Sequence, residues 1–479
     1  MGAINKSSFI NIRLGLLAAA AIFAVLEFSV LHSLRPLTHF VQDFWVRSEA
    51  AASRYDQDIL LVNIDERSLV EMAPLVGRWP WPRSVYAVLL EGILPHDPKA
   101  VVFDILVSDR HVEHPESDLY FVKTAVKDER VFMPLVRLPV EDGSKNVGLP
   151  LAKYADEMGF IRTEQAEPDA HAAVILPLGK LATTGRTGAI NFLADSDGMG
   201  RRYPLYQAVQ GWRIPSLPMR VALNLSFALP ENAAFTLNWG GTEPYKRPAV
   251  SFVDMYRAAN GRESPLLESV EGKIVILGST APQLHDSLPT PFSGTHPGVD
   301  ILATAIANLK NGNWLQTPPD WSNWLATALL LAVLAYLLKR SKGVLLAGGL
   351  LLVLTPTLAM AGLAAARSGW LIGGIAPLAI GWGYYLATGG YAFIQERRSR
   401  LHAVRTFGRF LDPRVVAELV KNENALPDLK GRSAQVTVLF SDIRGFTTLS
   451  ESRPPEEIVA LLNDYFSRQV AIIFKYGGT

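Results

Sequence analysis

The pattern of apolar positions separates a mixed central region from apolar blocks on either side of it. Residues 14–34 form an apolar stretch of roughly the 20 residues that a helix needs to cross a bilayer. Further such stretches follow closely on one another at residues 321–338, 344–366 and 370–394. The pattern therefore predicts α-helical transmembrane segments, one before and three after residues 35–320.

The central region has no comparable apolar span and alternates short apolar runs with helical patterns. Short runs that are apolar throughout are typical of parallel strands buried on both faces. The segments between them have apolar positions spaced near 3.6 residues, as in helices that pack on a sheet. We therefore predict an α/β domain with a largely parallel sheet and outer helices. The runs are residues 59–64, 100–105, 188–192 and 273–278, and the helical segments are 83–93, 118–126 and 298–309.

Composition supports membrane insertion and excludes several kinds of chemistry. Hydrophobic residues make up 49% of the 479 residues, and the mean hydropathy of +0.17 is high for a soluble protein. The net charge of +1 gives no basic excess, so we expect no nucleic acid partner. The chain has no cysteine, which excludes disulfides, thiolate metal sites and cysteine nucleophiles.

Basic residues next to the apolar spans predict the orientation in the membrane. Lys6 and Arg13 precede the first span, and the loop at 339–342 and the tail at 396–405 are also basic, whereas the turn between the last two spans carries only Arg367. Positive residues favour the cytoplasmic side. We therefore expect a multi-pass protein of a bacterial inner membrane, anchored by an uncleaved first helix, with its central domain in the periplasm.

The stretch VTVLFSDIRGFTT at residues 436–448 carries the strongest chemical pattern. The alternation over 436–440 predicts a buried strand, which stops at Asp442 just before Gly445. A carboxylate at the carboxyl end of a strand can hold a hard cation such as Mg²⁺, although an Asp there can also cap the next helix. Pro454 and Pro455, followed by two glutamates, predict a helix start. The apolar face of that helix should pack on the strand.

The octapeptide FSDIRGFT at residues 440–447, followed by the Pro-Pro helix start and EEIVALLNDYFSRQVAIIFKYGG, resembles the opening metal-binding motif of class III nucleotide cyclases, whose catalytic domain is α+β. The resemblance implies that Asp442 is the first of two metal-binding aspartates and that the Ile443 carbonyl contacts the same metal. It also implies that Gly445, Phe446 and Thr447 approach the triphosphate. The reaction would be attack of the ribose 3′-hydroxyl on the α-phosphate of a nucleoside triphosphate, ATP being favoured, with two Mg²⁺ or Mn²⁺ ions and a homodimer.

Residues 431–479 cover only the first part of such a domain, and residues 395–430 resemble the coupling segment that precedes it. In that family the second aspartate lies on the strand after Thr479, so we expect this chain alone not to catalyse. The alternative is a non-catalytic membrane receptor with a degenerate cyclase-like output module. A second aspartate in a longer sequence would favour the enzyme.

The central region, residues 35–320, resembles the CHASE2 sensor domain through several blocks in order. The resemblance implies a periplasmic input module whose ligand is unknown. The blocks are VNIDERSL (62–69), GRWPWPR (77–83), AVVFDILVSD (100–109), NFLADSDGMGRRYPL (191–205), PSLP (215–218) and KIVILGSTAPQLHDSLPTP (273–291).

A sensor pocket is predicted where polar residues follow the apolar runs. Asp65 and Asp104 each come directly after a predicted strand, and His285 and Asp286 lie in a loop after another. These residues should converge at one edge of a parallel sheet, where ligands bind. The alternative is that each carboxylate caps a helix or a turn, and that His285 makes a local hydrogen bond.

Three other features have a structural and a functional interpretation, and we favour the structural one for each. The sequence DSDG at 195–198 is typical of a turn rather than a calcium loop, with Arg201 and Arg202 pairing to its aspartates. The Trp-Pro repeat at 79–82 indicates a buried corner more than a stacking platform. Glu27, inside the first apolar span, should sit against a neighbouring helix rather than act functionally.

The predicted topology can be tested with a protease confined to the periplasm of intact cells. The protease should cut within residues 35–320 and leave residues 431–479 intact, because the membrane shields the cytoplasmic side. Immunoblots with a tag at each end report the fragment sizes. Cleavage within residues 431–479 before cell lysis would contradict the topology.

Overall fold

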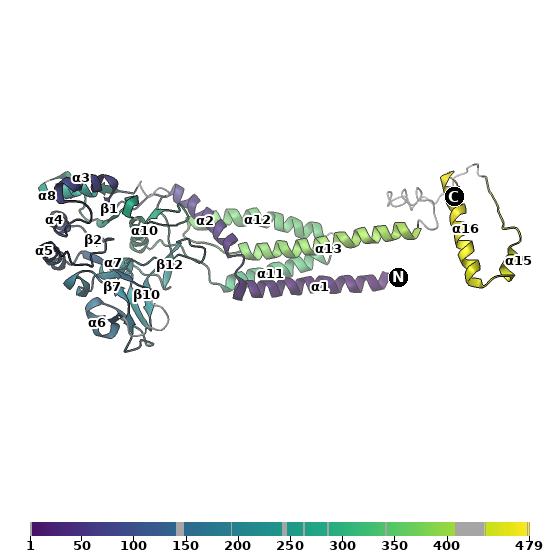
Figure 1. The fold of residues 1–479 in the computed structure, drawn as a ribbon, viewed down its shortest axis with the longest axis horizontal. Helices are drawn as coiled ribbons and strands as arrows, with labels where there is room; N and C mark the ends of the chain where they lie inside the picture. The colour runs from purple at the N-terminus through teal and green to yellow at the C-terminus, as the bar shows by residue number, and fades with distance from the viewer. Residues whose placement is uncertain are drawn as a thin grey trace. The chain divides into compact units, whose positions relative to one another are not determined.

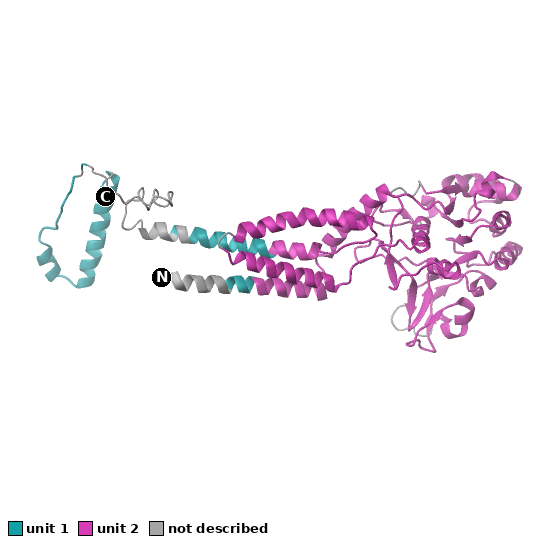
Figure 2. Ribbon diagram, turned by 180° about the vertical axis from the view of Figure 1, so that it is seen from behind, with its two compact units in different colours: residues 1–16, 384–479 teal, residues 17–383 magenta. Residues whose placement is uncertain are grey.

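The computed structural model describes residues 2–139, 148–192, 194–241, 247–261, 264–284, 287–340, 343–407, 435, 437–476 and 478. The chain divides into two compact units (Figure 2). Residues 17–383 form one unit, which contains the central domain and most of the apolar helices. Residues 1–16 and 384–479 form the other, and each unit is described by itself.

A largely parallel sheet forms the centre of the larger unit, as predicted. Its strands lie in the order β13-β1-β14-β2-β3-β7, and β8 also pairs with β3. Within this sheet only the pair β3–β7 is antiparallel. The strands are β13 (Ala249–Ser251), β1 (Ile59–Ile64), β14 (Ile274–Ser279), β2 (Ala100–Phe103), β3 (Val131–Arg137), β7 (Val174–Ile175) and β8 (Thr187–Ala189).

Alternate residues of the central strands pack into two different cores, because successive side chains of a strand point to opposite faces. On β1, Leu60 and Val62 belong to one core, and Ile59 and Leu61 belong to the other. The first core contains residues of α3 (Glu66–Val76), α4 (Ser84–Ile93), α5 (Pro115–Lys127), α8 (Phe252–Gly261) and α9 (Pro265–Glu268). The second contains residues of α7 (Leu217–Asn224), α10 (Gly298–Asn311) and the end of α2 (Arg35–Ala52) (Figure 1).

A third, smaller core lies in the part of the domain with short antiparallel strands. It includes α6 (Leu151–Met158) and residues of β5 (Ile161–Arg162), β6 (His171–Ala172) and β11 (Trp212–Pro215). The remaining short elements are β4 (Leu149–Pro150), β9 (Arg202–Pro204), β10 (Tyr206–Val209), β12 (Ala234–Thr236), β15 (Ser287–Leu288), β16 (His296–Pro297), η2 (Leu94–His96), η3 (Gly179–Thr183) and η5 (Pro282–Leu284).

Three helical segments in the described part of the chain are long and apolar enough to cross a membrane, namely Ile12–Leu31, Trp321–Leu338 and Gly343–Arg367. The first is formed by α1 (Gly2–Leu26) and the π-helical turn η1 (Glu27–Leu31), and therefore ends before residue 34. The others are α11 (Trp321–Leu338) and α12 (Gly343–Arg367).

The fourth predicted span, residues 370–394, falls largely in α13 (Ile375–Phe407), which does not reach that apolar limit. The helix begins at Ile375, after a turn in which Gly374 has a φ of 98°. Its sequence is less apolar because it contains glycines, tyrosines and Trp382. It continues past residue 394 into the predicted linker, whose residues 408–430 lie outside the described part. The fourth crossing stays a prediction.

The two structural interpretations that concern buried side chains are supported. The Trp81 ring is fully buried and stacks on Phe252 at a centroid distance of 4.9 Å, in a corner where the Trp79–Pro80 peptide is cis. The buried Glu27 carboxylate accepts hydrogen bonds from the backbone of Ser33 at 2.9 Å and of Leu34 at 2.7 Å. It therefore satisfies backbone groups at the start of α2 instead of sitting against a separate helix.

Close packing of α4 on α8 predicts an effect of Gly92→Ala. A methyl group at Gly92 would overlap Cα and Cβ of Ala259, so the helices would have to separate. We expect the free energy of unfolding to fall by about 1–2 kcal/mol, because overpacking outweighs the better helix propensity of alanine. Thermal unfolding of the full chain in detergent, followed by circular dichroism, measures this.

The matched control is Gly261→Ala at the end of α8, where no described atom lies within 4 Å of the added methyl group. This variant should keep the stability of the wild type. Equal stability of the Gly92 and Gly261 variants would contradict the tight α4–α8 contact.

Candidate functional site

The predicted strand at 436–440 is not formed in the described residues. Thr437 to Phe440 have no regular secondary structure, and Val436 lies outside the described part. Val438 is 66% exposed, Leu439 80% and Phe440 91%. The prediction of a buried strand is therefore wrong for this chain. A strand is completed by hydrogen bonds to a neighbouring strand, and no described residue pairs with this segment.

The motif itself forms a turn that leads into the short helix α15 (Phe446–Glu451). Gly445 is the N-cap residue, with a left-handed φ of 76° that favours glycine. The Phe446 N–H donates to the Ile443 carbonyl at 3.2 Å. No side chain caps this helix, so Asp442 does not have the capping role that was the alternative interpretation. Its carboxylate is exposed.

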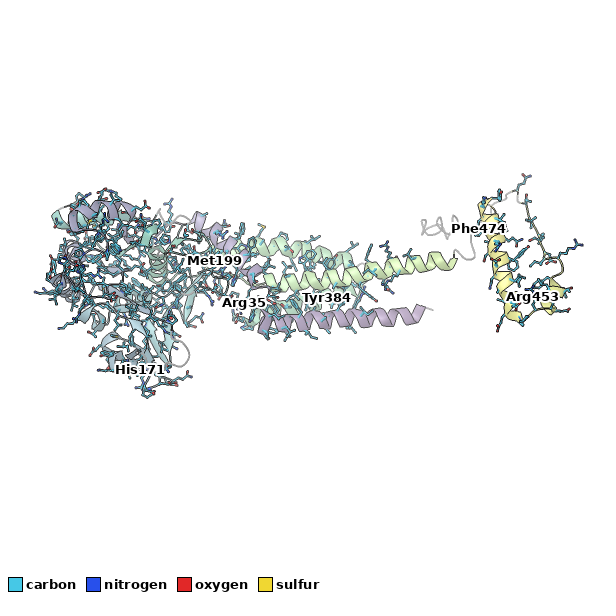
Figure 3. The ribbon with its side chains drawn as sticks, viewed as in Figure 1. Arg35, His171, Met199, Tyr384, Arg453 and Phe474 are labelled. Atoms are coloured by element: carbon cyan, nitrogen blue, oxygen red, sulfur yellow. The ribbon has the colours of Figure 1, made fainter. Side chains whose placement is uncertain are left out.

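The predicted helix after the proline pair is present as α16 (Pro455–Lys475), with Glu456 and Glu457 in its first turn. Its apolar face does not pack on a strand, which corrects the prediction. Figure 3 labels Arg453 and Phe474 near the two ends of this helix. The described contact with the motif segment is polar, from Gln469 Nε2 to Ser441 Oγ at 2.8 Å. Val459, Leu461, Tyr465, Phe466, Val470 and Ile472 are exposed, and Ile458 is buried.

Asp442 and the carbonyl of Ile443 are oxygen donors of the type that Mg²⁺ and Mn²⁺ prefer. Mg²⁺ in nucleotide enzymes is commonly held by one or two carboxylates together with substrate phosphates and water. The exposed carboxylate fits such a set. The Ile443 carbonyl fits as well, because its bond from Phe446 uses only one of its two lone pairs. These donors fit part of a metal site.

In the sensor domain, Asp65 caps α3. Its Oδ1 accepts hydrogen bonds from the Ser68 N–H at 2.7 Å, from Ser68 Oγ at 2.6 Å and from Ser251 Oγ at 2.9 Å. The capping interpretation is therefore confirmed for this residue, and a role for it in a ligand pocket stays a prediction.

Asp65 and Asp104 follow parallel strands and therefore lie at the same edge of the sheet, as predicted. The strands β1 and β2 are separated by β14, so the two residues are roughly 10 Å apart across the sheet, two strand spacings. The Asp104 N–H donates to the Leu277 carbonyl on β14 at 2.7 Å. His285 and Asp286 lie outside the described residues. The structure thus brings two of the four predicted pocket residues to one edge.

The DSDG turn at 195–198 is part of an ion-pair network. The Asp195 carbonyl accepts from the Gly198 N–H at 2.9 Å, which closes the turn. Arg201 reaches Asp197 at 2.8 Å and Asp195 at 3.2 Å, and Arg202 reaches Asp195 at 2.6 Å. The predicted pairing of both arginines with the turn is confirmed.

Arg201 also binds Asp43 on α2 through two hydrogen bonds, of 2.8 and 2.9 Å. Sequence reasoning missed this partner, because 158 positions separate the two residues and no spacing links them. His39, one helical turn before Asp43, places Nδ1 3.5 Å from Asp197. The network therefore connects the turn to the helix that follows the first apolar span.

The same residues include a possible set of metal ligands, since the ligand atoms of His39, Asp195 and Asp197 lie within 4.8 Å of one another. However, the hydrogen bonds from Arg201 lower the pKa of the Asp197 carboxyl well below its usual range. The guanidinium already supplies the positive charge that a cation would bring. The arrangement is an ion-pair network and not a metal centre.

A cavity of about 1290 Å³ adjoins this network. Residues of α2, the 194–196 segment, the 314–320 segment and the start of α13 line it. Met199 next to the turn and Arg35 at the start of α2 both lie where the sensor domain meets the helices (Figure 3). The cavity is thus placed beside the ends of the predicted membrane spans.

Comparison with known families agrees with both resemblances. The CHASE2 domain model matches residues 17–337, more than half of the chain, and the chain belongs to this family. The model of the adenylate and guanylate cyclase catalytic domain matches residues 430–477. The protein therefore combines a CHASE2 sensor with a cyclase-type segment, in the order that the sequence motifs predict.

Two curated relatives match short stretches of the chain. Adenylate cyclase 1 of Rhizobium meliloti (strain 1021) is 39% identical over 80 residues, which are 16% of this chain and 11% of that protein. The speract receptor of Strongylocentrotus purpuratus is 35% identical over 88 residues, 17% of this chain and 8% of that protein. The chain thus aligns with about a tenth of these relatives. No solved structure matches it.

The capping geometry predicts different effects for two substitutions of Asp65. Asp65→Ala should lower the free energy of unfolding by about 1–2 kcal/mol, because Ser68 and Ser251 lose their acceptor. Asp65→Asn should cost less, since an amide oxygen can accept the same bonds. Thermal unfolding of both variants in detergent tests this, and an equal loss would show that the negative charge is required.

Proposed function

We propose that the protein is a membrane-bound signalling cyclase, in which the CHASE2 domain senses a periplasmic ligand and regulates formation of a cyclic nucleotide in the cytoplasm. The FSDIRGFT motif, within the residues that match the cyclase model, is the observation that carries the proposal. The class of reaction follows from the family. The substrate is ATP, and the products are cyclic AMP and pyrophosphate.

The number of membrane crossings supports the assignment of the two sides. Three crossings would leave residues 435–476 on the same side of the membrane as the sensor, away from cytoplasmic nucleoside triphosphates. A fourth crossing through α13 returns the chain to the cytoplasm. The basic residues after residue 395 agree with that direction.

In this proposal Asp442 and the Ile443 carbonyl hold a divalent cation, Mg²⁺ or Mn²⁺. Two bound cations in a complete site lower the pKa of the ribose hydroxyl and neutralise charge on the phosphates. Gly445 permits the turn that brings the backbone of Phe446 and Thr447 toward the triphosphate. The chain's contribution is to position the metal and the phosphates.

A homodimer would complete the site, because in this family active sites form between two catalytic domains. The exposed apolar side chains of α16 agree with packing against further protein. The alternative function is a receptor whose cyclase-like module binds without catalysis. The match to the speract receptor is the observation that favours it.

Asp442→Ala tests the proposed chemistry. In a preparation of the protein that forms cyclic nucleotide, this variant should lose at least about 100-fold in metal-dependent activity, since a metal ligand is removed. Cyclic AMP and cyclic GMP formed from ATP and GTP are measured by chromatography in membranes.

The matched control is Asp464→Ala on α16, which removes an exposed aspartate that pairs only with Arg468 among the described residues. Its activity should equal that of the wild type. Full activity of the Asp442 variant would refute the assignment, and membrane insertion should be unchanged in both variants.

A further inference from the structure

The helix α2 has one side on the sensor domain and the other on the membrane helices. It follows the first apolar span directly, and Val46 and Ala50 belong to the core that covers one face of the central sheet. Trp45 belongs to a separate core with Ala366 and Ile375, which lie at the end of α12 and the start of α13. A displacement of α2 therefore changes contacts on both sides.

The contact with the sensor is polar. The two hydrogen bonds from Arg201 to Asp43 are made where the side chain of each residue is only 11% exposed. A bidentate, partly buried pair of this type is strong and holds both groups in one orientation. Arg47 Nε, on the same helix, donates to the Pro291 carbonyl.

The contact with the membrane helices is apolar and close. Trp45 is 1% exposed, and its ring occupies the space beside Gly362, where a methyl group would overlap it. Gln42 Nε2 donates to the Ile372 carbonyl at 3.3 Å, in the connection between α12 and α13. The tryptophan thus fixes α2 to that connection.

A single guanidinium joins the 195–198 turn to α2. Arg201 bonds Asp195 and Asp197 on the turn and Asp43 on the helix, and we call these four residues the Arg201 clamp. Loss of the arginine would leave Asp43 partly buried without its cation, which is unfavourable. Arg202 pairs only with Asp195 among the described residues, and its side chain is 62% exposed.

We propose that the Arg201 clamp is the mechanical link through which the sensor domain sets the position of α2 and, through Trp45, the connection between α12 and α13. Arg201 is thus a positioning residue for the output. The effect on cyclic nucleotide formation rests on the proposed function, whereas the link itself concerns residues 17–383 alone.

Hydrogen exchange of the full chain in lipid nanodiscs tests the link. In Arg201→Ala, the amides of α2 and of residues 195–199 should exchange at least about tenfold faster, because both sides of the clamp are released. In Asp43→Asn, α2 should exchange faster while the turn stays protected by Arg201. The matched control, Arg202→Ala, should leave α2 unchanged.

Transmission to the membrane helices has its own readout. The Leu371 N–H donates to the Gln316 carbonyl at 2.8 Å, and the Gly374 N–H donates to Asn323 Oδ1 at 3.2 Å. Both amides should exchange faster in the Arg201 and Asp43 variants. Unchanged exchange at these amides, or at α2, would overturn the proposal. Faster exchange throughout β1 and β14 would also overturn it, since the arginine would then only stabilise the fold.

A nucleotide assay separates this proposal from the proposed function. If the protein forms cyclic nucleotide, Arg201→Ala and Asp43→Asn should change the rate in the same direction, and Arg202→Ala should not. If no preparation forms cyclic nucleotide, the proposed function fails while the exchange experiment still decides the mechanical link. Opposite effects of the Arg201 and Asp43 variants on the rate would contradict a single link.

Discussion

Burial of the parallel sheet on both of its faces is the constraint on which the sensor domain depends. The strands β1, β14 and β2 hydrogen-bond to one another, and their side chains alternate between two cores. Each face must be covered by apolar helix surface, since neither can meet water. The helices α3, α4, α5 and α8 cover one face, and α7, α10 and the end of α2 cover the other. The polar residues that follow the strands therefore lie at one edge.

The covering of the second face also connects the domain to the membrane. The end of α2 contributes apolar residues to that face, while its other side carries Trp45 into the contact with α12. One helix thus belongs to two cores. The charged residues around Asp43 lie between these cores, where partial burial makes their pairing strong and directional. A sensor built in this way can pass a displacement on through packed side chains.

The cyclase-type segment shows how local and non-local structure differ. The helix α16 forms from its own residues, because its proline start, its first-turn acids and its spacing need no partner. The strand predicted before Asp442 needs a neighbouring strand, and in the described residues it has none. The exposed apolar positions of both segments remain available for further packing. The motif can therefore be recognised from its residues even where its surroundings are incomplete.

The sequence by itself determined the elements whose formation depends on local pattern: the apolar runs that became β1, β2 and β14, the helices α4, α5 and α10, and three apolar spans. It also placed Asp65 and Asp104 at the ends of strands and paired Arg201 with the neighbouring turn. Only the tertiary structure decided that β14 separates those two aspartates and that Arg201 reaches Asp43. Contacts between residues far apart in the chain depend on how whole elements pack, and no periodicity or spacing records them.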